Sequence, residues 1–212
     1  MILFLDSISS LPEFSIIEDN KIIYSSKVLQ NSTERMSDSI VAVYLDLEKK
    51  FDFQKNLKNL IINTGPGSYT ALRIGIAFFS GLSLSQNIKL TGISCIDLFK
   101  YEIIDKNYAI TGIYIHSGNN QRFVCLYDNI NSIFHINKLE KNIFENKKKL
   151  NLKYFLYNNE MGIKDLNLNE NIIFQKIDFK DLILKNLNEI ISLPTKKIIK
   201  PIYISNNKIL NK

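Results

Sequence analysis

The stretch from Asn63 to Gly75 constrains the fold of this 212-residue chain more than any other part of it. It reads Asn-Thr-Gly-Pro-Gly-Ser-Tyr-Thr-Ala-Leu-Arg-Ile-Gly, with a short apolar run at residues 60–62 before it and a helical pattern from Ala71 to Gln86 after it. A short apolar run, a cluster of Gly, Pro and Ser, and then apolar residues at helical spacing predict a strand, a tight turn and a helix in that order.

The turn residues each suit a tight connection between strand and helix. Gly65 lets the chain leave the strand at an angle that a side chain would block. Pro66 and Gly67 suit the two central positions of a type II turn, in which the second needs a positive φ. Ser68 and Thr70 are both candidate N-caps for the helix that follows.

Two interpretations of this turn are open. The free N–H groups of a helix N-terminus can bind an anion, or the turn serves only to place the helix closely against a sheet. The sequence is not a P-loop, because no lysine lies between Gly65 and Gly81. It is not a G-x-S-x-G elbow, because Tyr69 and Thr70 follow Ser68. On chemistry alone we favour the structural interpretation.

The first half of the chain predicts one complete α/β unit. The expected elements are strands at Ile2–Leu5, Phe14–Ile17 and Lys21–Ser25, a helix at Ser32–Lys50, a strand at Leu60–Asn63, the helix at Ala71–Gln86, a strand at Ile88–Gly92 and a helix from Ser94 to Ile104. The order β-β-β-α-β-α-β-α is the plan of an RNase H-like lobe, the unit of actin-like ATPases (the ASKHA fold).

The second half begins in the same way, but its later strands and helices are fewer and shorter. Three strands are expected at Tyr108–His116, Arg122–Tyr127 and Ile133–Leu139, followed by short strands at Tyr154–Leu156 and Ile172–Phe174, a helix at Phe179–Ile191 and an extended end at Pro201–Ile204. We therefore predict an α/β protein of two RNase H-like lobes, residues 1–106 and 107–212, the second one reduced.

The net charge of +6 is a poor argument for specific nucleic-acid binding. Nearly all the positive charge is lysine, and the arginines are only Arg35, Arg73 and Arg122. Arginine is the residue that makes bidentate phosphate and guanine contacts. We expect a solvated lysine surface and leave a weak, nonspecific attraction to nucleic acid open.

Cysteine content and hydropathy predict a cytoplasmic protein. The chain has only Cys95 and Cys125, without a C-x-x-C pair, which suits a reducing compartment. No apolar run approaches the roughly 20 residues that cross a bilayer. The N-terminus lacks a basic segment and reaches Asp6 too soon for a signal peptide.

Candidate catalytic residues are few. Asp6 ends the first strand and is the best candidate for a vestigial nucleotide site, although a turn residue bonding its own backbone is the favoured interpretation. His116 and His135 lie on different expected strands and do not form a metal-binding pair. Cys95 begins a helix, which lowers a thiol pKa, but a small core residue is the commoner case. We predict no catalytic residue, metal or cofactor.

The two helices on either side of the central strand carry more apolar surface than one sheet face needs. Excess of this kind implies a second contact, either with a third helix or with a partner. Gly75 and Gly81 are costly in a helix and suggest the close approach of another backbone. The candidate partner residues are Met36, Ile40, Val43, Tyr44, Leu72, Ile74, Gly75, Phe78, Phe79 and Leu82.

The central stretch resembles the signature of a known family. Gly65 to Thr70, followed by Leu72-Arg73-Ile74-Gly75, is similar to the G-P-G-S-F/Y-T-x-x-R-I-G signature of the TsaB family, whose members take part in the threonylcarbamoylation of the tRNA adenosine beside the anticodon. The similarity extends to Ile2–Ser7, Thr91–Leu98, Ile115–Tyr127 and Pro201–Ile204.

The resemblance implies a noncatalytic scaffold. TsaB proteins resemble a TsaD-type enzyme that has lost its site, and they pair with TsaD through the two helices named above, with the ATPase TsaE joining the assembly. The metal-binding histidines of TsaD are absent from the helix at Ser32–Lys50. This sequence departs from the family at its H-S-E, where Asn31-Ser32-Thr33-Glu34 stands, and at its D-A-R, where His116-Ser117-Gly118 stands.

Two alternatives remain open. The first is a metallopeptidase or ATPase of the actin-like fold that acts alone. The second is a scaffold that pairs with a second copy of itself through the same helices. Contact with tRNA is expected to be indirect or weak, and contact with a membrane is not expected.

Overall fold

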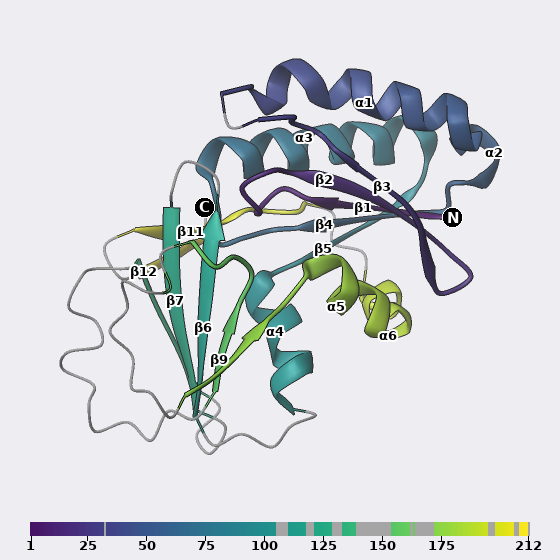
Figure 1. Cartoon of the computed structure of the whole chain (residues 1–212). Helices are drawn as coiled ribbons and strands as arrows, with labels where there is room; N and C mark the ends of the chain where they lie inside the picture. Colours follow the sequence, from purple (N-terminus) through teal and green to yellow (C-terminus); the bar gives the residue numbers. More distant parts are fainter. Residues whose placement is uncertain are drawn as a thin grey trace.

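The structure is a computed structural model that describes residues 1–31, 33–104, 110–117, 121–128, 133–138, 154–161, 163, 172–194, 198–205 and 208–211. Its first half is one mixed sheet with helices on both faces (Figure 1). The strands are β1 (Ile2–Asp6), β2 (Glu13–Glu18), β3 (Lys21–Lys27), β4 (Asn59–Asn63) and β5 (Lys89–Ile93), in the order β3-β2-β1-β4-β5. The helices are α1 (Met36–Phe51), α2 (Phe53–Asn56), α3 (Tyr69–Gln86) and α4 (Cys95–Ile104).

Strand β4 lies inside this sheet and is parallel to both of its neighbours, β1 and β5. Its residues Leu60, Ile61 and Ile62 are all fully buried. Leu60 and Ile62 face the layer of α1 and α3, whereas Ile61 faces the core that includes α4. A strand covered on both faces reads as a continuous apolar run, which is why the sequence before the turn predicts it.

The second half repeats the strand order of the first. Strands β6 (Ile110–Ser117), β7 (Gln121–Asp128), β8 (Ile133–Lys138), β9 (Tyr154–Tyr157) and β10 (Ile173–Lys176) form a sheet in the order β10-β9-β6-β7-β8. Helices α5 (Phe179–Lys185) and α6 (Leu187–Ser192) follow, and then a hairpin of β11 (Ile202–Ser205) and β12 (Lys208–Asn211). The predicted boundary at residues 106 and 107 lies outside the described residues.

The largest core joins the two halves. It contains helix α4 and the face of the first sheet that α4 covers, together with one face of the second sheet and the helices α5 and α6. Phe99 of α4 and Phe179 of α5 meet edge to face within it, with ring centroids 5.8 Å apart. Because the two sheets share this core, the second half is fixed against the first.

Two predicted helix boundaries are wrong. Asn31 and Glu34 do not start α1; the Asn31 side-chain oxygen accepts from the N–H groups of Thr33 and Glu34, which closes a separate turn before the helix begins at Met36. The single helix predicted after Phe179 is broken at Asn186, whose side chain donates to the carbonyl of Leu182 at 2.9 Å. Short polar side chains compete with the helix for backbone groups in both places.

The described helices include none long and apolar enough to cross a membrane.

Candidate functional site

The turn between β4 and α3 forms as predicted in outline but not in type. The Gly65–Pro66 peptide bond is cis, and Gly65, not Gly67, has the positive φ, of +115°. The type II prediction is therefore wrong. Ser68 stands at the N-cap of α3 without using its side chain as a cap, and Thr70 lies inside the helix.

The N–H group of Ser68 is bonded by the second half of the chain instead. It donates to the Oγ of Ser117, at the end of β6, over 2.8 Å. Gly67 makes this approach possible, because a Cβ there would lie 2.7 Å from Ile8 Cδ1 and 3.2 Å from Ser117 Oγ. The sequence singled out Gly67 correctly but for the wrong reason: it provides space rather than a positive φ. Ser117 was missed, because no local pattern marks a partner 49 residues away.

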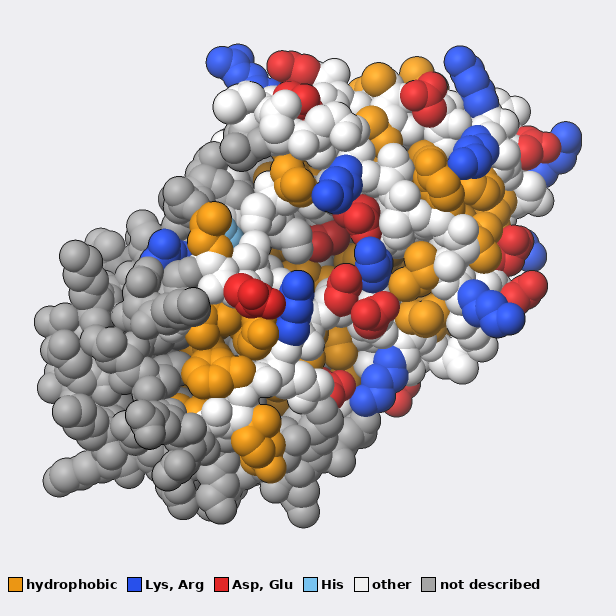
Figure 2. Space-filling view, viewed as in Figure 1, with side chains coloured by type: hydrophobic (Ala, Val, Ile, Leu, Met, Phe, Trp, Pro, Cys, Tyr) orange, Lys and Arg blue, Asp and Glu red, His pale blue; other side chains and the backbone are white. Residues whose placement is uncertain are grey.

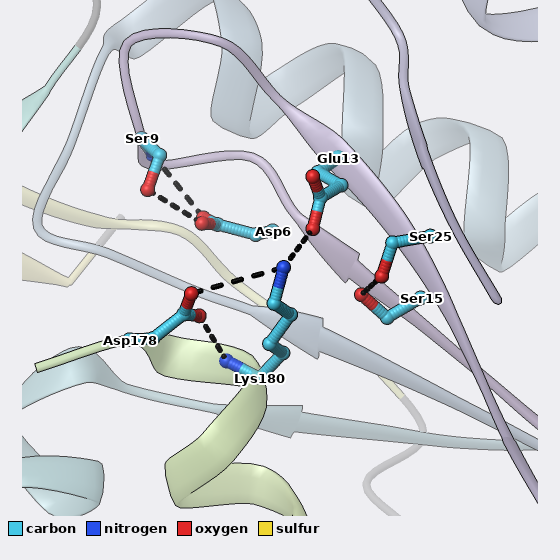
Figure 3. A network of polar contacts seen from close by, with 7 residues as sticks. All are labelled: Asp6, Ser9, Glu13, Ser15, Ser25, Asp178 and Lys180. Carbon is cyan, nitrogen blue, oxygen red and sulfur yellow. Dashed lines mark hydrogen bonds and ion pairs between the residues drawn. The ribbon is translucent and has the colours of Figure 1, made fainter. Parts of the chain in front are cut away.

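Asp6 serves the turn that follows β1. Its carboxylate accepts from the N–H of Ile8 at 2.9 Å. It also accepts from the N–H and the hydroxyl of Ser9, at 3.2 and 2.6 Å (Figure 3). The amide of Asn63 also donates to it, at 3.4 Å. Burial raises the pKa of this carboxyl above its ordinary value, although these hydrogen bonds oppose the shift. The favoured interpretation of Asp6 as a turn residue matches these contacts.

A cavity of about 700 Å³ lies where α1, α3 and the ends of β1 and β6 meet. Its wall is mostly hydroxyl-bearing and apolar, with one guanidinium and one carboxylate. The lining residues are Ser9, Ser10, Pro12, Leu29, Glu34, Arg35, Met36, Ser37, Ser68, Thr70, Ala71, Ile74, His116, Ser117 and Met161. Such a wall can hold a small polar molecule by hydrogen bonds.

Several polar groups of this wall are already engaged within the chain. Ser117 accepts from Ser68, Ser10 accepts from Asn159 at 3.0 Å, and Glu34 accepts from the N–H of Gln30 at 2.8 Å. Among the residues that the structure describes, no group of three or more His, Cys, Asp or Glu side chains could hold a metal ion.

The structure describes the side chains of two of the three other candidates for chemistry, and both are core residues. Cys95 is fully buried, and this burial raises its thiol pKa well above the ordinary value, so the helix start does not activate it. His116 is buried on β6, the middle strand of the second sheet. His135 lies on β8, and its side chain is outside the described residues.

An ion-pair cluster joins the two halves beside this site. Lys180 of α5 reaches across to Glu13 of β2 at 2.7 Å and lies 3.8 Å from Asp178 (Figure 3). Asp178 also caps α5 by accepting from the N–H of Lys180 at 3.0 Å. Sequence reasoning missed this cluster, since Glu13 and Lys180 are 167 residues apart.

Burial divides the predicted partner residues into two groups. Met36, Ile40, Tyr44, Leu72, Gly75 and Phe79 are buried inside this chain. Val43, Ile74, Phe78 and Leu82 are half-buried. The residues of the first group therefore cannot contact a partner directly and can only hold the exposed residues of α1 and α3 in place.

The accessible apolar residues of the two helices lie next to the predicted ones. Val41 and Leu45 of α1 are 49% and 43% exposed, and Tyr69 and Leu84 of α3 are 51% and 85% exposed. Figure 2 shows hydrophobic side chains over this helical layer, interspersed with charged ones. The sequence predicted the excess of apolar residues, but only packing decides which of them reach the surface.

The predicted close approach at the two helix glycines is not found as expected. A Cβ on Gly75 would lie 3.2 Å from Ile62 Cδ1 and from Leu5 Cδ2, so α3 packs tightly on side chains of its own sheet. A Cβ on Gly81 would meet nothing within 4 Å. Gly75 is thus explained by the fold, and Gly81 faces open space in this chain.

This combination of repeated strand order, shared core and cavity at the strand ends defines an α/β protein of the RNase H-like, actin-like class. Solved structures agree. YeaZ from Pseudomonas aeruginosa matches with a TM-score of 0.63 and 10% identity, covering 96% of this chain and 99% of that one. A second P. aeruginosa structure, described as similar to the peptidase YeaZ, gives 0.62 and 9% with the same coverage.

A Bacteroides thetaiotaomicron protein with an actin-like ATPase fold and unknown function matches with a TM-score of 0.53 and 8% identity, covering 87% of this chain and 95% of that one. At these identities the likeness establishes the fold alone. The predicted fold class is thereby confirmed.

The family is given by the sequence. The family model for TsaD, tRNA N6-adenosine threonylcarbamoyltransferase, matches residues 30–191, and the chain belongs to this family. Together with the fold of YeaZ, the TsaB protein, this match confirms the TsaB resemblance predicted from the signature. The function of the chain is thus related to the threonylcarbamoylation of tRNA adenosine. No curated protein sequence gives a significant match.

Proposed function

We propose that this protein is a noncatalytic partner of a TsaD-type enzyme in forming the threonylcarbamoyl group on the tRNA adenosine beside the anticodon. The chain pairs with TsaD through the layer of α1 and α3, and a TsaE-type ATPase joins the assembly. Threonylcarbamoyl-adenylate and tRNA are handled mainly on the partner. The site of action is the cytoplasm, which suits a chain with only two cysteines, both of them buried.

The observation that carries the proposal is an accessible apolar strip on the α1–α3 layer, defined here as Val41 and Leu45 of α1. Val41 and Leu45 lie one turn apart on α1, so their side chains are neighbours on the helix surface. Both are more than two-fifths exposed although the same helix buries Met36, Ile40 and Tyr44 beneath them. Exposed apolar residues that gather on one element mark an interaction surface better than isolated ones do.

The chemistry of the described residues supports a scaffold over an enzyme acting alone. Asp6 is engaged in its own turn, Cys95 is sealed in the core, and the Ser68 N–H is taken by Ser117. A general acid or base must reach a substrate proton, and a nucleophile needs a base beside it. Neither arrangement is provided by these three groups.

Surface variants test the pairing. The double substitution Val41→Glu and Leu45→Glu places two charges on the strip without entering the core, and we expect it to weaken binding to TsaD about tenfold or more. Ile173→Glu, at a site on β10 that is 56% exposed, is the matched control and should leave binding unchanged. Phe78 is a poorer target, because its ring lies 5.4 Å from that of Tyr44 and 6.4 Å from that of Phe14.

The functional readout is tRNA modification reconstituted from purified components. We expect the full set of proteins to modify tRNA, omission of this chain to abolish modification, and the chain alone to have no activity. Turnover of peptide or ATP by the isolated chain, or full modification in its absence, would overturn the proposal.

A further inference from the structure

The C-terminal strap, defined here as residues 198–205, crosses the turn between β4 and α3. The N–H of Ile202 donates to the carbonyl of Thr64 over 2.7 Å. One residue further on, the ring of Tyr203 lies on that of Tyr69 at the start of α3, with centroids 4.7 Å apart. The strap therefore contacts both the beginning of the turn and the helix that follows it.

Two glycines of the first half are fitted to this strap. A Cβ on Gly65 would lie 2.6 Å from the carbonyl oxygen of Ile202, and a Cβ on Gly92 would lie 2.7 Å from Ile199 Cγ2. Real Cβ atoms do not come this close, so a side chain at Gly65 would displace the backbone of the strap, and one at Gly92 would force the side chains of Ile199 and Thr64 to shift. Gly65 of the family signature is explained by a segment 137 positions later (202 − 65).

The strap also connects the two halves of the molecule. Ile199 packs against the core between the first sheet and the α1–α3 layer, whereas Tyr203 and Ile204 pack against the core shared by the two sheets. Both residues belong to β11, and the hairpin that β11 forms with β12 lies against β8 of the second sheet. Figure 1 shows the yellow C-terminal segment running along the first sheet towards this hairpin.

The turn is thus held from two directions, by the strap at Thr64 and by Ser117 of β6 at Ser68. We propose that the strap is a conformational latch that fixes the start of α3 against both halves, so that displacing it loosens the turn and the wall of the adjoining cavity together. Because Ser68 and Thr70 line that cavity, release of the strap changes its shape. A consequence for binding to TsaD rests on the proposed function, but the latch itself does not.

Hydrogen exchange of the chain alone tests the latch. The double variant Ile199→Ala and Tyr203→Ala removes the side chains that hold the strap. The matched control, Ile198→Ala and Tyr203→Phe, alters a side chain that is 71% exposed and keeps the ring. We expect the amides of Ser68 and Cys95, whose acceptors are Ser117 Oγ and the Gly65 carbonyl, to exchange about tenfold faster or more in the test variant only.

The amide of Ile61, in the centre of β4, reports whether the fold survives and should keep its protection in both variants. If Ile202 exchanges faster while Ser68 and Cys95 do not, the strap is a passive tail and the proposal is wrong. If Ile61 also loses protection, the test variant has lost its fold, and the single variant Tyr203→Ala then decides by the same comparison. Binding to TsaD, measured in parallel, separates the outcomes: a latch confirmed by exchange stands even where no pairing is found.

Discussion

The outer faces of the two sheets differ although the strand order of the sheets is the same. The outer face of the first sheet is covered by α1 and α3 over a large apolar cluster, in which Phe14 and Phe79 stack with centroids 6.0 Å apart. On the corresponding face of the second sheet, the described buried cluster contains only Tyr114, Val124 and Phe155. In the part of the chain that the structure describes, one strand plan thus supports a thick apolar layer in one half and a thin one in the other.

The difference between the two outer layers shows where the apolar residues of the chain are concentrated. The thick layer ends in an accessible strip that includes Val41 and Leu45, whereas Ile173 and Phe174 are exposed at the edge of the thin half. For the proposed pairing with TsaD, one rigid surface matters more than two symmetrical lobes. The first half supplies that surface, and the second half fixes the turn at its base through Ser117.

Truncating one phenylalanine in each half gives the largest expected effect and can break this comparison. Phe79→Ala should lower the free energy of unfolding by about 4 kcal/mol, because its rigid surroundings leave a cavity. Phe155→Ala should cost about 3 kcal/mol, since a smaller cluster collapses more easily. Urea denaturation of both variants measures the difference. Equal costs would mean that the second half is packed as firmly as the first.

The two glycines of α3 compare a tightly packed position with an open position on the same helix. Gly75→Ala should destabilise the protein by about 1 kcal/mol, because overpacking against Leu5 and Ile62 outweighs the better helix propensity of alanine. Gly81→Ala has open space and should stabilise it by about 1 kcal/mol. Thermal unfolding of the two variants gives the sign of each change. Destabilisation by Gly81→Ala would contradict the open environment.

The buried carboxyl of Asp6 predicts a dependence on pH. Its pKa is raised above 3.8 in the folded state, so folding favours the neutral form. The resulting stabilisation is fully present below pH 3.8 and is lost as the pH rises through the raised value, by about 1.4 kcal/mol for each unit of the shift. Asn at this position cannot titrate. The stability of the wild type relative to Asp6→Asn should therefore fall between acidic and neutral pH in denaturation experiments, and a rise would refute the assignment.

The ion pair between the halves gives the smallest expected effect. Lys180→Met removes the contact with Glu13, in which both side chains are about one-quarter exposed, and should cost about 0.5–1 kcal/mol. Lys55→Met removes the surface pair with Asp52 and serves as the control, for which no measurable change is expected. Denaturation at low and high salt measures both. A salt-independent loss at Lys180 would point to packing rather than charge.

The amino-acid sequence by itself determined the order of the longer strands and helices, the position of the central turn and the family, but not the short helix α2, the break between α5 and α6 or strand β12. These are local properties: the apolar run at residues 60–62, the helical spacing of α3 and the Gly-Pro-Gly cluster can be read within a few residues. The sequence also favoured a turn role for Asp6 and a core position for Cys95, and the hydrogen bonds of Asp6 and the burial of Cys95 agree with these interpretations.

Only the tertiary structure decided which residues of α1 and α3 are accessible and why the glycines of the turn are needed. Gly67 gives space to Ser117, and Gly65 gives space to Ile202, and both partners come from distant parts of the chain. Local periodicity identifies the apolar residues of a helix, but the neighbours that bury or expose them are brought together only when the sheets and helices pack.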